Sequence, residues 1–476
     1  MQNKINKLIS YANQKELLDP RDNDFMFNQL CYLLNVTPKS SFKAVAVKAH
    51  IDDILNDIAD KFQKFDTNTE RELFKSKVIG TVIDRPSNIE AKFKELKAKS
   101  SQDATEFFYN FAKDVNYVKE REVAKNIEYQ TKSEYGDIDI TINLSKPEKS
   151  TKEIEMLKKA KASNWPACFL CKEQEGLYGS MHNPDRSNHR IVGVDINQSK
   201  WYLQYSPFSY FNEHSILLSE THSDMKINRN TFANLLDFVE QFPHYMIGSN
   251  ADIPIVGGSM LTHDHYQCGN YEFPLFKAMS HVEAQFGGVS LYSVKWPMHT
   301  VKLVADSKYE ILEVADKVLT KWLAYADPDN NIYDFIDERH NTITPIARYH
   351  NGHFEMYLIL RNNLTTDEHP TGIYHVDSSR HHIKQENIGL IEAMGLAVLP
   401  GRLKAEMEQL ATAKELPTEL EKHKPLFDAI NQEQPKNNKQ FLYSEIGKIF
   451  VHCLEDCGVF KYNQDKYIEF IRSIDE

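Results

Sequence analysis

The sequence predicts a mixed α/β protein of the α+β type, with helical segments at both ends of a strand-rich middle. Residues 51–62 carry apolar side chains at positions 51, 54, 55, 58, 59 and 62, the repeat of an amphipathic helix. Residues 138–142 alternate apolar and polar side chains, as a half-buried strand does. Residues 188–194 and 201–207 have the composition of neighbouring strands, so both element types are expected in one chain.

The remaining elements follow in order along the chain. In the N-terminal third, helices are also expected over residues 105–115 and 152–161, so we expect residues 1–160 to be mostly helical. Further on, the patterns predict a strand at 210–218, helices at 230–242 and 308–324, strands at 289–294 and 354–360, a buried helix at 388–399 and a solvated helix at 404–414. Cys453 and Cys457 fall in an expected C-terminal helix.

Length, charge and cysteine count limit the class of protein. A chain of 476 residues suggests two or three domains. The net charge of −12 argues against nucleic acid as the main partner, although it leaves room for a local basic pocket. Six cysteines are too few for a disulfide scaffold of this length, so reduced thiols or a metal site are expected.

The N-terminal residues and the hydropathy pattern bear on location. The first seven residues lead into no apolar segment of the kind found in signal peptides. No run of about 18 apolar residues is present, as a membrane-spanning helix would require. We therefore expect a cytoplasmic protein with no membrane partner.

The stretch of residues 249–269 has the character of a phosphate-handling site. If residues 261–267 are extended, His263, His265 and Gln267 share one face. Upstream, the sequence Gly257-Gly258-Ser259 can bring backbone N–H groups close to an anion. A neutral imidazole is a competent nucleophile toward phosphorus near pH 7. A histidine pair on a partly exposed strand, or a pair of metal ligands, would produce the same pattern.

Other candidate residues are more ambiguous on their own. Cys168 and Cys171 form a Cys-x-x-Cys pair, which indicates a metal site or redox chemistry, but no thioredoxin-like helix start follows. His214 enters an apolar strand, where a histidine is usually a buried structural residue. Arg348 and Arg361 are candidate phosphate clamps, because guanidinium offers paired donors, or they are structural arginines. The four histidines His369, His375, His381 and His382 are spaced too loosely for a metal site, and they are typical of solvated surface or of a polar loop near the mouth of an active site.

Taken together, these residues resemble a known family. Cys168, Cys171, His214 and His263, followed by His265 and Gln267, are similar to the zinc ligands and His-x-His-x-Gln motif of galactose-1-phosphate uridylyltransferases of the histidine-triad superfamily. The surroundings, including residues 248–259 and 389–400, resemble the bacterial class II branch. The resemblance implies a histidine-triad-like antiparallel sheet core with duplicated halves, a catalytic half at 161–300, a supporting half at 301–400 and a helical tail at 401–476.

The resemblance also implies a chemistry and a set of roles. UMP would pass from UDP-glucose to galactose 1-phosphate, yielding UDP-galactose, through a uridylyl-histidine at His265, with Gln267 holding the phosphoryl oxygens. A structural zinc ion would be held by Cys168, Cys171, His214 and His263. The residues implied to bind substrate are Asn188, Asn250, Gly258 and Ser259. Neither magnesium nor iron is expected, and a homodimer is.

Three other functions remain open from the sequence. A related histidine-triad hydrolase or dinucleoside polyphosphate phosphorylase would use His265 but accept water or inorganic phosphate. A zinc-stabilised binding protein would perform no turnover. A metallohydrolase would use His263 and His265 together as metal ligands. Asp264 stands where class I enzymes have proline, so the stiffness of the motif must come from other residues.

Overall fold

The computed structural model describes residues 1–145, 165–180, 182–257 and 260–475. They form two compact units. Unit 1 comprises Met1–Arg121, Pro147–Ser209 and Glu213–Ser223, and unit 2 comprises Glu122–Lys146, Tyr210–Asn212 and Asp224–Glu476. The helix expected over residues 152–161 lies outside the described residues. The four ranges predicted as domains stay a prediction.

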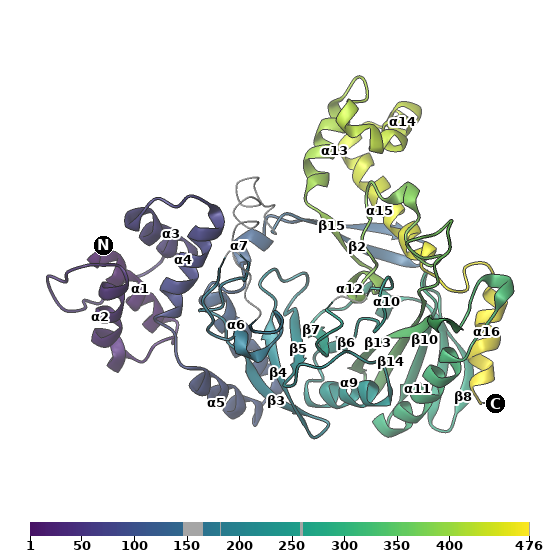
Figure 1. The fold of residues 1–476 in the computed structure, drawn as a ribbon, viewed down its shortest axis with the longest axis horizontal. Coiled ribbons are helices and arrows are strands. Elements are labelled where there is room, and N and C mark those ends of the chain that lie inside the picture. The colour runs from purple at the N-terminus through teal and green to yellow at the C-terminus, as the bar shows by residue number, and fades with distance from the viewer. Residues whose placement is uncertain (146–164, 181, 258–259, 476) are drawn as a thin grey trace. The chain divides into compact units, whose positions relative to one another are not determined.

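Unit 1 begins with six helices in the described part of the chain (Figure 1). They are α1 (Gln2–Gln14), α2 (Asn23–Leu33), α3 (Ile51–Phe62), α4 (Asn68–Gly80), α5 (Pro86–Lys97) and α6 (Ser101–Asp114). Helix α3 coincides with the predicted amphipathic segment, and its apolar stripe is buried. Its first turn is capped by the imidazole of His50, which accepts from the N–H of Asp52 at 3.1 Å. The predicted helical character of this region is confirmed.

Three neighbouring antiparallel strands complete unit 1. Their order is β3 (Val192–Ile196), β4 (Ser199–Tyr205) and β5 (Ser215–Ser219). Asn197 and Gln198, both with positive φ, close the two-residue hairpin between β3 and β4. The strand predicted at 188–194 therefore begins only at Val192. The turn formed by the residues before it is held by the N–H of His189, which donates to the carbonyl of Arg186 at 3.0 Å.

Unit 2 is built on a longer antiparallel sheet. Its strand order is β7 (His265–Gly269), β6 (Met246–Gly248), β13 (Asn341–His350), β14 (His353–Asn362), β10 (Thr300–Ala305), β9 (Val289–Val294) and β8 (Ser280–Phe286). Strands β9 and β14 confirm the strands predicted at 289–294 and 354–360. Helices α9 (Arg229–Gln241) and α11 (Lys308–Leu323) pack on β13 and on each other (Figure 1). The predicted α+β fold class is confirmed.

A smaller sheet in unit 2 corrects one prediction. Its order is β1 (Ile127–Ser133), β2 (Gly136–Asn143) and β15 (Leu396–Pro400), and β15 runs parallel to β2. The buried helix predicted at 388–399 is wrong, because only α12 (Leu390–Ala393) is helical there. Gly395 adopts φ +95°, which ends the helix and starts the strand. A continuous apolar run is compatible with either element, so its periodicity could not decide.

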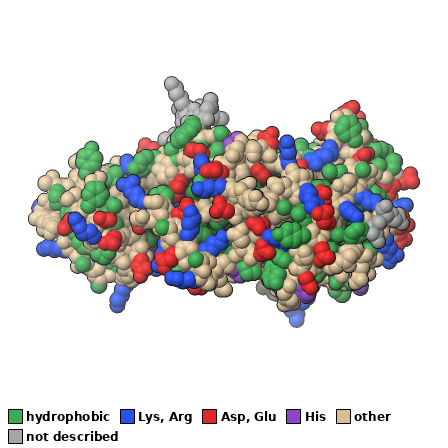
Figure 2. Space-filling view, turned by 90° about the horizontal axis from the view of Figure 1, so that it is seen from below, with side chains coloured by type: hydrophobic (Ala, Val, Ile, Leu, Met, Phe, Trp, Pro, Cys, Tyr) green, Lys and Arg blue, Asp and Glu red, His purple; other side chains and the backbone are tan. Residues whose placement is uncertain are grey.

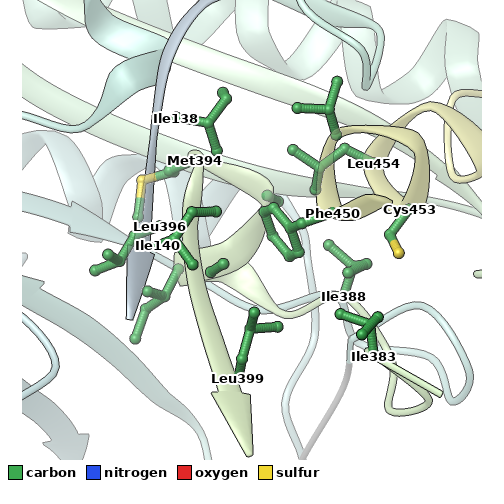
Figure 3. Packing of buried hydrophobic residues seen from close by; sticks show 14 of the residues in the cluster. Ile138, Ile140, Ile383, Ile388, Met394, Leu396, Leu399, Phe450, Cys453 and Leu454 are labelled. Atoms are coloured by element: carbon green, nitrogen blue, oxygen red, sulfur yellow. The ribbon is translucent and has the colours of Figure 1, made fainter. Parts of the chain in front are cut away.

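Three C-terminal helices close a large hydrophobic core around this small sheet. They are α13 (Arg402–Thr412), α14 (Lys424–Glu433) and α15 (Asn438–Asp456). The last helix, α16 (Gln464–Arg472), packs on β8 and β9 of the longer sheet, and the short helix α10 (Pro274–Lys277) precedes β8. Figure 3 shows Ile138 and Ile140 of β2 and Leu396 of β15 with Phe450 and Leu454 of α15, all buried. The helical C-terminal tail is therefore confirmed as part of the core of unit 2.

His299, which directly precedes β10, binds helix α16 to the longer sheet. Its Nε2–H donates to Oε1 of Gln464 at 3.1 Å, and its Nδ1 accepts from the N–H of Phe460 at 3.3 Å. These bonds require the neutral ring, and burial lowers the pKa of His299 to about 4.

We expect this histidine to make unit 2 sensitive to acid. Between about pH 6.5 and pH 4 the unfolded chain binds a proton at His299 that the folded protein does not, so the free energy of unfolding decreases as the pH is lowered. The loss due to His299 reaches about 3 kcal/mol. Urea titrations from pH 7.5 to 4 should show a shallower acid limb for His299→Gln than for the exposed control His281→Gln. Equal slopes would contradict this account.

The surface shows mixed charge. On the face in Figure 2, Lys and Arg side chains are interspersed with Asp and Glu, within a net charge of −12. Among the described helices, none combines the length and apolar character needed to cross a membrane.

Candidate active site

Strand β7 of unit 2 carries the two predicted catalytic residues. His265 opens the strand, and Gln267 pairs with Gly248 of β6. Side chains alternate along a strand, so His265 and Gln267 project to one face and Tyr266 to the other. The Tyr266 hydroxyl is buried and accepts a hydrogen bond from the side-chain amide of Asn234 in α9 at 3.0 Å. This bond ties the rear of the strand to a helix and so fixes which face His265 presents.

The tautomer of His265 follows from one hydrogen bond. Its Nδ1 lies 2.7 Å from the carbonyl oxygen of His263. A carbonyl only accepts, so Nδ1 carries the proton and Nε2 carries the lone pair. Burial lowers the pKa of His265, which is 6 % exposed, so the ring is neutral at pH 7. His265 therefore offers an oriented, uncharged nucleophile at Nε2.

The approach to this strand differs from the prediction. Residues 260–263 form a turn, closed by the N–H of His263, which donates to the carbonyl of Met260 at 3.3 Å. Met260 adopts φ +55°, which no strand allows. The expected extended run over 261–267 is thus wrong in its first half, and His263 is not on the strand. The turn is what brings the carbonyl of His263 to the imidazole of His265.

Asn250 follows β6, and a segment that is distant in the sequence holds its side chain. Its Oδ1 accepts from the N–H of Leu390 at 2.9 Å, and it is 3 % exposed. Since Gly248 lies opposite Gln267 in an antiparallel pair, continuing along the chain from Gly248 leads toward the His265 end of β7. With its oxygen engaged, the amide of Asn250 has N–H groups to donate.

The loop after Asn250 is fastened by residues that the sequence did not single out. The carboxylate of Asp252 accepts from the N–H of Ile227 at 3.0 Å and from the hydroxyl of Thr342 at 2.6 Å, and it pairs with Arg339 at 2.8 Å. No local pattern marks these contacts, because the partners of Asp252 lie from 25 to 90 residues away along the chain. Such anchoring makes the loop rigid enough to present a ligand site.

Backbone strain is concentrated in the same loop. Ile255 adopts φ +76°, an outlier for a β-branched residue, and Gly257 adopts φ +91°. A Cβ on Gly257 would lie 2.5 Å from the carbonyl oxygen of Ile388. Glycine is therefore required at position 257 both by conformation and by space. The neighbouring predicted residues Gly258 and Ser259 lie outside the described part of the chain.

Substituting Gly257 tests this requirement. We expect Gly257→Ala to lower the free energy of unfolding by about 1–3 kcal/mol. It should also lower kcat/KM, because the added Cβ would displace the loop from the carbonyl of Ile388. Gly352 is a matched control with φ +87°, and a Cβ at this position would meet no other atom within 4 Å among the described residues. Gly352→Ala should show only the smaller conformational cost and unchanged kcat/KM. Equal losses in both variants would show that the contact with Ile388 does not matter.

The remaining predicted substrate residues lie in well-bonded surroundings. Asn188, in unit 1, donates its side-chain N–H to the carbonyl of Val115 at 2.9 Å and is 2 % exposed. Arg348, in unit 2, pairs through Nε with Glu355 at 2.6 Å and through Nη1 with Glu272 at 3.0 Å. Two carboxylates already satisfy this guanidinium, which favours a structural role over phosphate binding.

Unit 1 brings together residues that could hold a metal ion. The sulfur atoms of Cys168 and Cys171 lie 3.6 Å apart, and the Cys171 sulfur lies 3.3 Å from Nδ1 of His222. Two thiolates on a tetrahedral zinc ion lie about 3.7 Å apart, given Zn–S bonds of about 2.3 Å. The salt bridge from Lys172 to Glu220, at 2.8 Å, ties the cysteine turn to the segment that carries His222. These donors fit zinc without rearrangement.

The predicted ligand set needs one correction. His222 belongs to the group of candidate ligands, and His214 does not. His214 precedes β5 and His222 follows it, and five strand residues span about 16 Å. The two histidines therefore lie at opposite ends of the strand, and His214 is a buried residue, 3 % exposed. The only signal for His222 was its position just beyond the predicted strand.

The comparisons with known proteins match both units of the chain. The family model "Galactose-1-phosphate uridyl transferase, N-terminal domain" matches residues 24–224, and its C-terminal counterpart matches residues 237–426. The chain belongs to this family. A galactose-1-phosphate uridylyltransferase of Fusobacterium nucleatum is 42% identical, with 99% of this chain and 98% of the relative covered. One of Lactococcus lactis is 43% identical, with 99% and 98% covered.

Solved structures resemble this family member only distantly. The crystal structure of yeast Ap4A phosphorylase Apa2 is 11% identical with a TM-score of 0.39, and covers 72% of this chain and 96% of its own. A DUF4931 family protein from Bacillus cereus is 13% identical with a TM-score of 0.26, covering 35% and 83%. At scores this low, the fold class rests on the strands and helices themselves.

Proposed function

We propose that the protein is a UDP-glucose:hexose-1-phosphate uridylyltransferase that works through a uridylyl-histidine at His265. The observation that carries this proposal is the bond from Nδ1–H of His265 to the carbonyl of His263, at 2.7 Å, which leaves Nε2 as a neutral nucleophile. Relatives that match the whole chain bear the name galactose-1-phosphate uridylyltransferase. The substrates would be UDP-glucose and galactose 1-phosphate.

The reaction balances in two displacements. In the first, the lone pair of His265 Nε2 attacks the α-phosphorus of UDP-glucose, and the bond from that phosphorus to the bridging oxygen breaks, releasing glucose 1-phosphate. In the second, a phosphate oxygen of galactose 1-phosphate attacks the same phosphorus, and the P–N bond breaks to release UDP-galactose. The amide N–H groups of Gln267 and Asn250 would donate to the phosphoryl oxygens and stabilise the charge that builds up on them.

A structural zinc ion is part of the proposal. Cys168, Cys171 and His222 would supply three ligands, and His263 is the remaining member of the same group of candidate ligands. When bound, zinc in such a closed four-ligand set contributes to folding and leaves no open position for substrate. The roles of Gly258 and Ser259 in holding phosphate belong to the same proposal, as do a homodimer and a cytoplasmic location.

Intact-mass spectrometry tests the proposed function directly. The protein is mixed with UDP-glucose alone and quenched at alkaline pH, where a phosphoramidate survives. We expect a mass gain of one uridylyl group, discharged on adding galactose 1-phosphate. Accumulation of UMP without any sugar phosphate would instead indicate a histidine-triad hydrolase. Release of glucose 1-phosphate without an adduct would exclude the covalent route.

A further inference from the structure

Arg361 of β14 is a buried cation with no counter-charge among the described residues. It is 2 % exposed. Its guanidinium donates to the carbonyl of Ile388 at 3.1 Å and, weakly, to the hydroxyl of Thr344 at 3.4 Å. Neither of these acceptors carries a charge. Arg348, on the adjacent strand, pairs with Glu355 and Glu272, so Arg361 is the exception of the two.

The thiol of Cys457 does not compensate this charge. Cys457 is the group whose charge would favour the protonated guanidinium, but burial raises the pKa of its thiol to about 11. The thiol is therefore neutral at pH 7. Burial also lowers the pKa of Arg361 to about 10, which still leaves it charged. A buried charge with no partner costs stability, and proteins retain such groups mainly at functional sites.

A short chain of contacts links Arg361 to the loop of residues 250–257. The carbonyl of Ile388, which accepts from Arg361, is the same atom that packs against Gly257. The side chain of Ile388 points into the hydrophobic core (Figure 3). Two residues further on, the N–H of Leu390 holds Asn250. One peptide segment thus separates the guanidinium from both ends of the loop of residues 250–257.

Neighbours of Arg361 hold the same loop. Thr342 lies opposite Arg361 in the β13–β14 register and donates to Asp252 at 2.6 Å. Asn363 donates to the carbonyl of Pro254 at 3.4 Å. The ends of these two strands therefore form the platform under the loop, and Arg361 is the charged residue within it.

We propose that Arg361 is a positioning residue that fixes residues 250–257 through Ile388 and whose uncompensated charge strengthens the binding of substrate phosphate groups at that loop. The inference rests on the proposed function, which assigns Asn250 to the nucleotide. The charge acts through a region of low dielectric, where solvent screens it little, so it favours an anion without touching it.

Binding of UDP and of uridine to the full-length protein separates this role from a purely structural one. A field effect acts on the diphosphate and not on the uncharged nucleoside. We expect Arg361→Met to weaken UDP binding at least about tenfold and uridine binding less than about twofold, by calorimetry. Arg361→Lys, which keeps the charge, should retain most of the UDP preference. Arg472→Met removes an arginine whose side chain is 65% exposed, and should change neither affinity.

Each other outcome overturns the proposal. Equal weakening of UDP and uridine would mean that Arg361 only shapes the pocket, and no weakening would mean that it is unconnected to the loop. If Arg361→Met does not fold, Arg361→Lys decides: a loss of UDP preference despite the retained charge contradicts the field effect. A uridylyl adduct in the wild type with unchanged UDP binding in Arg361→Met would refute only this inference. No adduct in the wild type would refute the proposed function.

Discussion

Replacing His265 by alanine is expected to lower kcat by at least about 10⁴-fold and to abolish the uridylyl adduct. The side chain supplies the only bond that the protein itself makes to the α-phosphorus in the proposed mechanism, so no partial reaction through the covalent route survives its loss. Binding should persist, because Asn250 and the loop of residues 250–257 do not depend on the imidazole. We therefore expect the Kd for UDP-glucose to change less than about fivefold. Single-turnover release of glucose 1-phosphate measures the loss.

A control histidine makes the result specific. His281 lies on β8 of the same unit and is exposed. His281→Ala should keep wild-type turnover and form the adduct. If His265→Ala retained both ligand affinity and biological activity, the protein would be a binding protein without turnover. If His265→Ala instead lost bound metal, His265 would be a ligand, as the metallohydrolase alternative requires.

Replacing His222 by alanine is expected to remove the metal, whereas replacing His214 is not. The structure places His222, 3.3 Å from the sulfur of Cys171, in the ligand group. Without this ligand a structural zinc site loses most of its affinity. We expect zinc measured by mass spectrometry to fall from about one ion per chain to below about 0.2 in His222→Ala. A loss of about 3 kcal/mol would lower the thermal midpoint by about 6–12 °C in a unit of this size.

The matched variant is His214→Ala, which removes a buried imidazole at the other end of β5. Some loss of stability is expected from the cavity, but zinc should remain at the wild-type level. Retained zinc in His222→Ala together with lost zinc in His214→Ala would reverse the correction. A chelator distinguishes structure from chemistry: if zinc is structural, activity should decay at the rate of unfolding and not at once.

Patterns that depend on neighbours in the chain were predictable. The stripe in residues 51–62 and the alternation in residues 289–294 identify α3 and β9 because helix and strand repeats are local. The apolar run at 388–399 was not, since it is buried either way and only the turn at Gly395 and pairing with β2 decide between helix and strand. The turn at residues 260–263 is not predictable either, because it depends on the positive φ of Met260, which no apolar or polar pattern indicates.

The sequence by itself determined the chemistry that this protein can carry: a His-x-His-x-Gln motif, a Cys-x-x-Cys pair and membership of a family, all properties of residue type and spacing. Only the tertiary structure decided which groups meet. His222 replaces His214 as a metal-ligand candidate because a strand separates them, and Leu390 reaches Asn250 across 140 residues. Both outcomes depend on strand order and loop path, which contacts between distant segments determine and local patterns do not record.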